Sequence, residues 1–287
     1  MESTYLQLMN DRFIEAIQRR RAVRTYSRQP VSDETKEGIR RLLRELSGPF
    51  EGTVRLELIE KKEVAAKEGV KLGTYGVVVG ASLFVAGAAG PGTQAMEQLG
   101  YVMEQAVLYL TSVGLGTCWL AGTFRRSAFA TAMHLKDDEM LPVVTPVGYA
   151  SRIRGPVDML FKPSLSRKRV PWGNLFFDGD LGKPLDKAAA GPFAVPLEMV
   201  RLAPSASNKQ PWRVLRRNGS FLFFLLADWV YRKMYEFHIQ KIDMGIALLH
   251  FEAAARQLGL PGHWENPSTD QSMPSKSLDH IMTWVVG

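Results

Sequence analysis

The pattern of apolar and polar positions changes along the chain, and each pattern predicts a different kind of element. Residues 11–21 and 32–46 carry apolar positions at helical spacing, and Ser32 can cap the second of these helices. Residues 53–60 alternate between apolar and polar side chains, which indicates a half-buried strand. The continuous apolar run 76–87 indicates a strand at the centre of a sheet. The chain is therefore expected to contain both helices and sheets.

Two longer helices, predicted for residues 93–113 and 241–258, are apolar on most sides and are expected at the centre of the protein. Four pairs of positions in and after these helices match at one constant offset: Gly100 with Gly245, Gly114 with Gly259, Leu115 with Leu260, and Trp119 with Trp264. A glycine inside a helix costs about 1 kcal/mol, so its repetition suggests close backbone packing. Two buried helices can share Gly, Ala and Leu by chance, but the ungapped match favours an internal duplication.

The composition is that of a globular protein with a core. The 287 residues are 46% hydrophobic and 23% charged, enough for one large domain or two ordinary ones. The net charge of +7 fits an anionic small ligand as readily as nucleic acid. The single cysteine, Cys118, excludes an internal disulfide framework, and the longest apolar run is shorter than the roughly 20 residues of a membrane helix. We therefore expect a cytoplasmic protein without a secretory signal or a membrane span.

The sequence predicts neither a metal site nor a catalytic triad. The five histidines show no metal-ligand spacing with Cys118 or with acidic residues. Cys118 follows an apolar helix and precedes Trp119, and His250 lies on the second apolar helix. Both are therefore expected to be buried core residues.

Five short motifs stand out in the sequence: RRAVRTY from Arg20, GLGTCWLAGTF from Gly114, VGYA from Val147, SRKRVPW from Ser166 and APSASNKQPW from Ala203. Together they resemble the motifs of the nitroreductase superfamily of FMN-dependent oxidoreductases. The ten-residue last motif is the most specific. Taken alone, each basic run reads as a solvated surface, and Asn208 and Gln210 could simply satisfy backbone groups in a turn.

The order of the motifs resembles nitroreductases in which two half-repeats share one chain. The first half has the arginine motif without the Ala-Pro-Ser loop, and the second half has the loop without the arginine motif. Ordinary family members are homodimers that bind FMN at their interface. The resemblance therefore implies an α+β, nitroreductase-like fold, internally duplicated to mimic that homodimer, with antiparallel-rich sheets flanking central helices. It implies halves 1–172 (phosphate anchor) and 173–287 (flavin-lining loop), interlocked as one globular unit that holds one flavin and can act as a monomer.

The resemblance also implies which residues bind FMN. Arginine suits the phosphate because its planar, charged donors bind oxygen atoms in pairs. The implied phosphate anchors are Arg20, Arg21, Arg167 and Arg169. Ala22 replaces the family's serine, so that one hydroxyl donor to the phosphate is lost.

A second set of residues is implied around the isoalloxazine ring. Arg24 would face the pyrimidine edge, where a cation stabilises the negative charge of reduced flavin. The residues implied to contact the ring and its polar rim are Pro204, Ser205, Ala206 and Asn208. Ala121 and Gly122 would present backbone amides to N5, which glycine allows through close approach. The GTYG run 73–76 either lies near the flavin or is a plain loop before a strand.

The function implied is that of an FMN-dependent NAD(P)H oxidoreductase. Hydride would pass from NAD(P)H through flavin N5 to a small electron-poor acceptor such as a nitroaromatic, a quinone or an enone. Flavin carries this chemistry, so no catalytic side chain is predicted. The alternative is a non-catalytic flavin-binding or storage protein on the same fold. A nucleic-acid binder is disfavoured because the basic segment 152–169 lacks interleaved aromatic residues.

Overall fold

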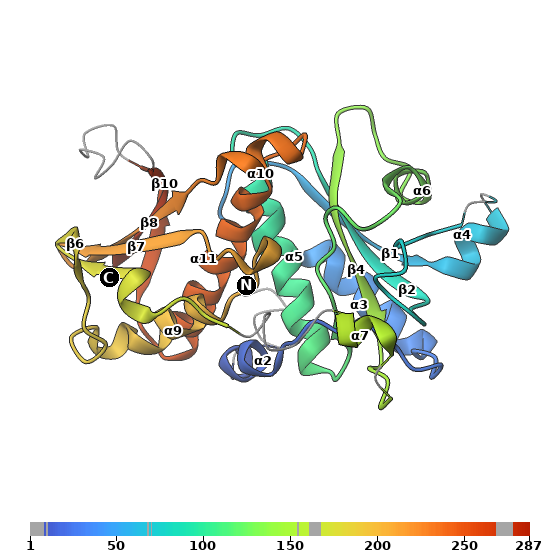
Figure 1. Ribbon diagram of the computed structural model, residues 1–287, viewed down its shortest axis with the longest axis horizontal. Coiled ribbons are helices and arrows are strands. Elements are labelled where there is room, and N and C mark those ends of the chain that lie inside the picture. The colour runs from blue at the N-terminus through green and yellow to red at the C-terminus, as the bar shows by residue number, and fades with distance from the viewer. Residues whose placement is uncertain are drawn as a thin grey trace. The chain divides into compact units, whose positions relative to one another are not determined.

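Helices and strands alternate throughout the sequence, and the chain folds into two units. The computed structural model describes the following residues: 9, 11–67, 69, 71–153, 155–160, 168–267 and 278–287. Unit 1 is formed by Met1–Met9 and Arg19–Arg167, and unit 2 by Asn10–Gln18 and Lys168–Gly287 (Figure 1). Residues 10–18, which lie in the first predicted half of the sequence, thus group with unit 2.

Among the described residues, the sheet of unit 1 has four antiparallel strands in the order β1-β2-β4-β3. Their bounds are β1 Val54–Glu60, β2 Leu83–Ala89, β3 Gly116–Thr117 and β4 Met140–Gly148. β1 is the half-buried strand predicted for 53–60, and the central strands β2 and β4 are almost entirely buried. The beginning of the strand predicted for 76–87 is wrong. β2 starts only at Leu83, because Val79 pairs through its backbone with residues 24–26 instead of with the sheet.

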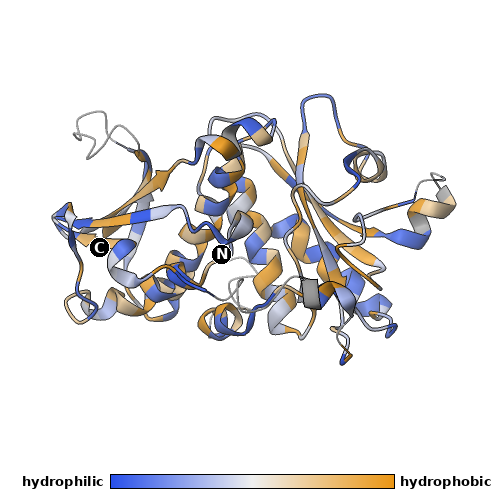
Figure 2. Ribbon diagram, viewed as in Figure 1, coloured by the Kyte–Doolittle hydropathy of each residue, from blue (hydrophilic) through white to orange (hydrophobic). Residues whose placement is uncertain are grey.

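The helices of unit 1 include two that were predicted, α3 Asp33–Glu45 and α5 Ala95–Ser112, and three that were not, α4 Lys61–Lys67, α6 Arg126–Ala132 and α7 Pro156–Leu160. Ser32 caps α3 as predicted, since its side chain accepts the backbone N–H of Thr35 at 3.2 Å. α5 is the helix predicted for residues 93–113, and it is buried on nearly all sides. Figure 2 shows hydrophobic residues along α5 and on the strands of the sheet.

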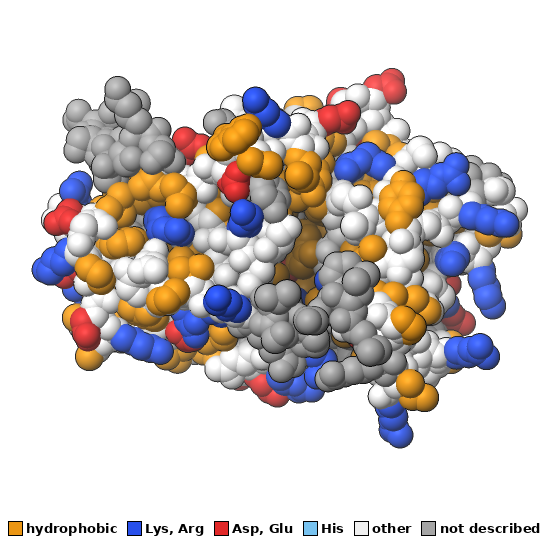
Figure 3. All heavy atoms as spheres, viewed as in Figure 1, with side chains coloured by type: hydrophobic (Ala, Val, Ile, Leu, Met, Phe, Trp, Pro, Cys, Tyr) orange, Lys and Arg blue, Asp and Glu red, His pale blue; other side chains and the backbone are white. Residues whose placement is uncertain are grey.

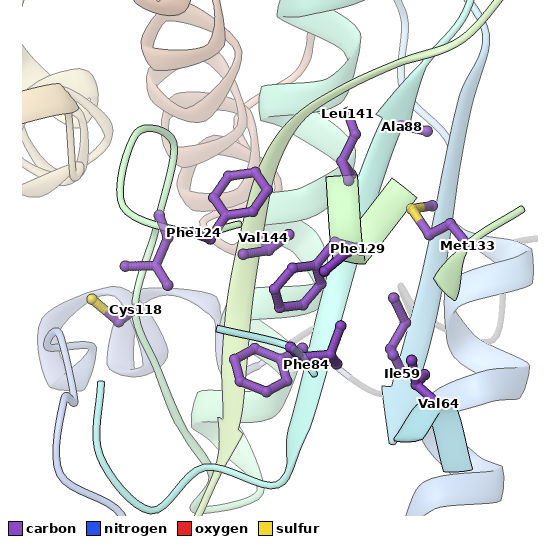
Figure 4. Packing of buried hydrophobic residues seen from close by; sticks show 14 residues of the cluster. Ile59, Val64, Phe84, Ala88, Cys118, Phe124, Phe129, Met133, Leu141 and Val144 are labelled. Atoms are coloured by element: carbon purple, nitrogen blue, oxygen red, sulfur yellow. The ribbon is translucent and has the colours of Figure 1, made fainter. Parts of the chain in front are cut away.

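A hydrophobic cluster fills one side of the unit 1 sheet (Figure 4). Phe84 of β2 and Phe129 of α6 meet edge to face, with ring centroids 5.1 Å apart, and Phe124 meets Phe129 in the same way at 5.5 Å. Cys118 is buried in this cluster, so its predicted place in the core is confirmed. The packing of these side chains fixes the path of the chain between α5 and α6.

The sheet of unit 2 has the strand order β6-β5-β7-β8-β10-β9 over the described residues. The strand bounds are β5 Phe176–Asp178, β6 Asp180–Pro184, β7 Trp212–Arg217, β8 Ser220–Leu226, β9 Gly262–Glu265 and β10 Leu278–Val286. β5 is parallel to β7, and the other neighbouring strands are antiparallel.

The helical elements of unit 2 surround its own long helix. Its α-helices are α2 Phe13–Arg19 (up to Gln18), α9 Ala194–Leu202, α10 Trp229–Met234 and α11 Ile239–Gln257, and its 3-10 turns are η1 Trp172–Asn174, η2 Gly191–Phe193 and η3 Ala206–Asn208. α11 is the helix predicted for residues 241–258. His250 on α11 is buried with its Nδ1 atom 2.9 Å from the carbonyl oxygen of Met199, so its predicted core position is confirmed. The N–H of Ile14 donates to Oε1 of Gln257 at 2.9 Å and ties α2 to the end of α11.

The two units repeat the same strand order around their long helices. The run β7-β8-β10-β9 in unit 2 has the order of β1-β2-β4-β3 in unit 1. Gly114 and Gly259 follow α5 and α11 with φ of +81° and +67°, the left-handed conformation in which glycine ends a helix. The α+β class and the antiparallel-rich sheets predicted from the sequence are confirmed. No helix in the described part of the chain has the length and apolarity required to span a bilayer.

Candidate functional site

The segment Arg20–Tyr26 joins three of the five motifs within unit 1. Ala22 forms a parallel bridge with Thr117, and Tyr26 forms an antiparallel bridge with Ala150. The N–H of Val23 donates to the carbonyl oxygen of Thr117 at 2.8 Å. The motifs RRAVRTY, GLGTCWLAGTF and VGYA, which lie far apart in the sequence, are therefore neighbours in space.

Glycines permit this close approach of the backbone. A Cβ atom on Gly116 would lie 2.7 Å from Cγ2 of Val23, and one on Gly80 would lie 2.6 Å from the carbonyl oxygen of Tyr26. Gly80 also has a φ of +83°, which side chains other than glycine rarely adopt. Gly116, the second glycine of the GLG sequence, thus allows the segment Arg20–Tyr26 to pack closely against it.

Arg20 lies in a largely buried position near an acidic residue of α5. Its side chain is 9% exposed, and its Nε atom is 4.0 Å from Oε1 of Glu104, whose side chain is fully buried. Oε2 of Glu104 accepts the indole N–H of Trp119 at 2.8 Å. The Nε of Arg20 has no hydrogen-bond partner among the described residues. A largely buried guanidinium with such a donor favours a further hydrogen-bond acceptor at this position.

Two further predicted residues, Arg21 and Arg24, lie within the same segment. Arg21 is exposed, and Arg24 is half-buried with its carbonyl oxygen accepting the N–H of Val79 at 2.8 Å. Burial raises the pKa of the Cys118 thiol, and the cations of Arg24 and Arg20 oppose that rise. The thiol is therefore held in its neutral form, in keeping with a core cysteine.

Ala121 and Gly122 form a bend directly after the bridge between Leu120 and Val144. A guanidinium nitrogen of Arg126 donates to the carbonyl oxygen of Ala121 at 3.1 Å. Gly122 is exposed. The bend is thus anchored at its carbonyl side by α6.

In unit 2 the loop 203–212 has an unusual backbone held by many hydrogen bonds. Ser207, Asn208 and Gln210 have positive φ values of 46°, 57° and 51°, which are uncommon outside glycine. Oγ of Ser205 accepts the N–H of Gln210 at 2.9 Å, and the carbonyl oxygen of Ser205 accepts the N–H of Asn208 at 3.0 Å. The small polar side chains therefore serve a tight turn rather than a regular helix end.

The basic motif SRKRVPW and this loop are in direct contact. Arg169 donates to Oδ1 of Asn208 and to the carbonyl oxygen of Leu202, both at 2.9 Å. The N–H of Val170 donates to Oε1 of the buried Gln210 at 2.9 Å. Arg169 thus contacts the end of α9 and the loop that follows it, and Asn208 and Gln210 do satisfy backbone and side-chain groups of a turn. Arg167, predicted beside Arg169, lies outside the described residues.

One functional candidate was missed by the sequence analysis. Asp243 on α11 is 3% exposed, and its Oδ1 accepts the N–H of Ala206 at 2.9 Å. Burial raises the pKa of Asp243 well above its usual value, and the hydrogen bond from Ala206 opposes this only in part. The signal available in the sequence was a single acidic residue inside the apolar stretch of a central helix.

The structure therefore holds two groups of predicted residues, one in each unit. Unit 1 assembles Arg20, Ala22 and Arg24 with the backbone that follows α5, and unit 2 assembles Arg169 with the Ala-Pro-Ser loop. No cluster of metal-ligating side chains occurs in the described ranges. Lys and Arg side chains are scattered over the face seen in Figure 3, which therefore shows no basic stripe of the kind that tracks nucleic acid.

Comparisons with known proteins agree with the motifs. A family model described as "Putative TM nitroreductase" matches residues 12–255, which is most of the chain. The chain is similar to the crystal structure of a putative nitroreductase from Thermotoga maritima MSB8, with 21% identity, a TM-score of 0.59 and coverage of 96% of this chain and 93% of that one. This likeness shows that the chain has the same fold. A search of curated protein sequences gave no match.

Two further similarities cover about half of the chain. One is to a nitroreductase with bound FMN from Desulfitobacterium hafniense DCB-2, with 15% identity, a TM-score of 0.38 and coverage of 50% of this chain and 92% of that one. The other is to an FMN-dependent nitroreductase from Clostridium difficile R20291, with 16% identity, a TM-score of 0.39 and coverage of 52% and 96%.

Proposed function

Because the chain belongs to this TM nitroreductase family, as its motifs predicted, we propose that it is an FMN-dependent oxidoreductase. It would pass a hydride from NAD(P)H to a small electron-poor acceptor such as a nitroaromatic, a quinone or an enone. Bound FMN supplies the redox chemistry, so the side chains of this protein bind and orient it. The observation that supports the proposal is the largely buried side chain of Arg20, whose Nε lies 4.0 Å from Oε1 of Glu104 and has no hydrogen-bond partner among the described residues.

The residues of unit 1 would bind the anionic end of the cofactor. Arg20 and Arg21 offer charged donors to the phosphate, and each charge-assisted hydrogen bond contributes about 1.5–3 kcal/mol. Arg24 would stabilise negative charge on the reduced ring. Ala22 packs against the hydrophobic cluster and offers no hydroxyl, which lowers the number of phosphate donors by one. Arg167 and Arg169 would add further positive charge.

The residues of unit 2 would contribute the loop that lines the ring. Pro204, Ser205 and Ala206 lie in a turn whose shape is fixed by Arg169 and Asp243, so the loop is ordered before the cofactor binds. Ordering in advance lowers the entropy cost of binding. We propose one FMN per chain, whose retention depends on residues of both units, with Ala121 and Gly122 supplying backbone donors.

The repeated strand order supports the proposal that the chain is a fused pair of half-repeats. β1-β2-β4-β3 and β7-β8-β10-β9 have the same pairing, and the long helix of each unit ends at a matched glycine. A chain that carries both halves needs no second copy to complete its set of motifs. A monomer is therefore the proposed functional state, and the cytoplasmic location stays a prediction.

Two measurements test the proposed function. The absorption spectrum of the purified protein, followed by release and titration of the flavin, should show one FMN per chain. Anaerobic stopped-flow mixing with NADH and with NADPH should then bleach the flavin with at least one of them. Bound FMN that neither nucleotide reduces would favour the storage protein, and failure to bind FMN at all would overturn both readings.

A further inference from the structure

Asp243 on α11 is a buried acidic residue with an unusual contact. It lies near the start of α11, it is buried, and it contacts a backbone amide of the loop 203–212 rather than a group of its own helix. Its Oδ2 atom is buried without a hydrogen-bond partner among the described residues. A carboxyl group in such surroundings costs folding free energy, so its presence calls for a compensating role.

Unit 1 carries a counterpart at the matching position of α5. Gln98 precedes Asp243 by the same offset that matches Gly114 with Gly259 and Trp119 with Trp264. Gln98 is 7% exposed, its Oε1 accepts the N–H of Phe50 at 3.1 Å, and its Nε2 donates to the carbonyl oxygen of Gly48 at 3.2 Å. At the same position of the long helix, a side chain thus accepts a backbone N–H of a loop in each unit.

The two loops also occupy matching places in the chain. The segment 46–53 runs from the end of α3 to β1, and the segment 203–211 runs from the end of α9 to β7. β1 and β7 hold the same place in the repeated strand order. The loop of unit 1 lacks the Ala-Pro-Ser sequence but is likewise anchored on the central helix.

We propose that Asp243 is a positioning residue of the proposed flavin site, which holds the loop 203–210 in its ring-lining shape through the amide of Ala206. This inference rests on the function proposed above. The hydrogen bond fixes the beginning of the turn η3, and Arg169 together with Gln210 fixes its end. Positive φ values at Ser207, Asn208 and Gln210 make this shape costly without such anchors.

The chemistry of the group explains how it can be replaced. Burial with no cation partner among the described residues favours the neutral carboxyl, and the raised pKa agrees with this. A neutral carboxyl accepts the Ala206 N–H through its carbonyl oxygen, and an asparagine side chain has the same shape and the same acceptor. Asp243→Asn should therefore keep the loop in place, whereas Asp243→Ala removes the acceptor.

Amide hydrogen exchange of the flavin-free protein and FMN titration by fluorescence quenching test the inference together. Asp243→Ala should speed exchange in the loop 203–210 and weaken FMN binding, each by about tenfold, the equivalent of one lost hydrogen bond. Asp243→Asn should stay close to the wild type in both. The matched control Gln98→Ala should speed exchange at Phe50 and leave FMN affinity unchanged.

Three outcomes would overturn the inference. The first is wild-type loop exchange in Asp243→Ala, and the second is an equal loss of FMN affinity in Gln98→Ala, which would indicate general destabilisation. The third applies even where the alanine variant does not fold: a tenfold loss of FMN affinity in Asp243→Asn with loop protection retained. If the wild type binds no FMN, the proposed function fails, while loop exchange still decides whether Asp243 holds the loop.

Discussion

The long helices of the two units end in the same way, but the arginine near a glutamate of each helix comes from a different part of the chain. After α5, the indole N–H of Trp119 donates to Glu104 at 2.8 Å, and after α11 that of Trp264 donates to Glu252 at 2.6 Å. Each tryptophan follows the matched glycine by the same number of residues. The helix end and the tryptophan therefore form a shared structural frame, and in each unit a glutamate of the helix accepts the indole N–H, although the two glutamates lie three residues apart in the matched register.

The cation beside each glutamate is what differs. Glu104 has Arg20 nearby, which comes from the segment after α2 and is 9% exposed. Glu252 has Arg256 at 2.7 Å, one turn further along the same helix and 53% exposed. The pair of Glu252 and Arg256 forms within one helix and its arginine is half exposed, so it contributes little, whereas Arg20 is a largely buried cation from a separate segment. Under the proposed function, Arg20 of unit 1 would bind the cofactor, and Arg256 of unit 2 would serve the structure alone.

Replacing the two cations gives the largest expected contrast. Arg20→Ala should weaken FMN binding about tenfold or more, because a charged contact of about 1.5–3 kcal/mol is lost. Arg256→Ala should leave FMN affinity unchanged. Fluorescence titration of both variants measures the difference. Equal affinities would remove the distinction between the two units.

The matched glycines test the part of the frame that is shared. Gly114→Ala and Gly259→Ala should each lower the free energy of unfolding by about 1–2 kcal/mol, since alanine disfavours a positive φ. An added Cβ atom meets nothing within 4 Å at either position, so steric clashes add no cost. Urea unfolding of the flavin-free protein measures both.

A third glycine provides the control for these variants. Gly38 lies inside α3 without a positive φ and with open space around it, so Gly38→Ala should stabilise the protein by about 0.5–1 kcal/mol. A large cost at Gly114 with none at Gly259 would show that the two helix ends are not equivalent.

The fold could be predicted as far as local pattern determines it. α5 and α11 follow from apolar residues on all sides, and the Ser32 cap from its position before an acidic first turn. The start of β2 could not be predicted, because Val79 has a strand-like sequence but its backbone pairs with residues 24–26. That pairing depends on where a distant segment docks.

The candidate site was predictable only where a motif carries its chemistry. Arg20 and the Ala-Pro-Ser loop belong to sequence patterns with a known spacing. The left-handed conformation of Ser207 and the contact of Arg169 with Asn208 depend on the folded loop, and no spacing rule reports them. Asp243 could not be predicted because one acidic residue in an apolar helix belongs to no motif.

The loops after α9 and α3 give a smaller contrast. Ser205→Ala removes the hydroxyl that accepts the Gln210 N–H, at a cost of about 0.5–1.5 kcal/mol, so FMN affinity should fall severalfold. Ser47 is an exposed serine in the loop after α3, and Ser47→Ala should not change FMN affinity. Titration of the two variants side by side tests whether only the loop of unit 2 serves the cofactor. A wild-type affinity in Ser205→Ala would contradict that role.

The smallest expected effect separates the units by their response to pH. In unit 1, hydrogen bonds from Arg55 lower the pKa of Glu139 from 4.5 to about 2. The contribution of Glu139 to the free energy of unfolding is therefore complete above about pH 4.5 and is lost as the pH falls toward 2. In unit 2, burial raises the pKa of Asp243 above 3.8, so its contribution is complete below that value and is lost as the pH rises through the folded-state pKa.

Two neutral variants should therefore reduce the pH dependence of the free energy of unfolding, Glu139→Gln on the acidic side and Asp243→Asn on the side of rising pH. Glu139→Gln should cost about 1 kcal/mol at neutral pH, since Arg55 is partly exposed and solvent screens the pair, and this cost should vanish in acid. Asp243→Asn should gain stability relative to the wild type as the pH rises. Urea unfolding across an acidic-to-neutral pH series measures both differences. Parallel pH profiles for the wild type and Asp243→Asn would mean that the carboxyl of Asp243 has the same protonation in the folded and the unfolded chain. That result would contradict the burial of this carboxyl on α11 and its contact with the loop.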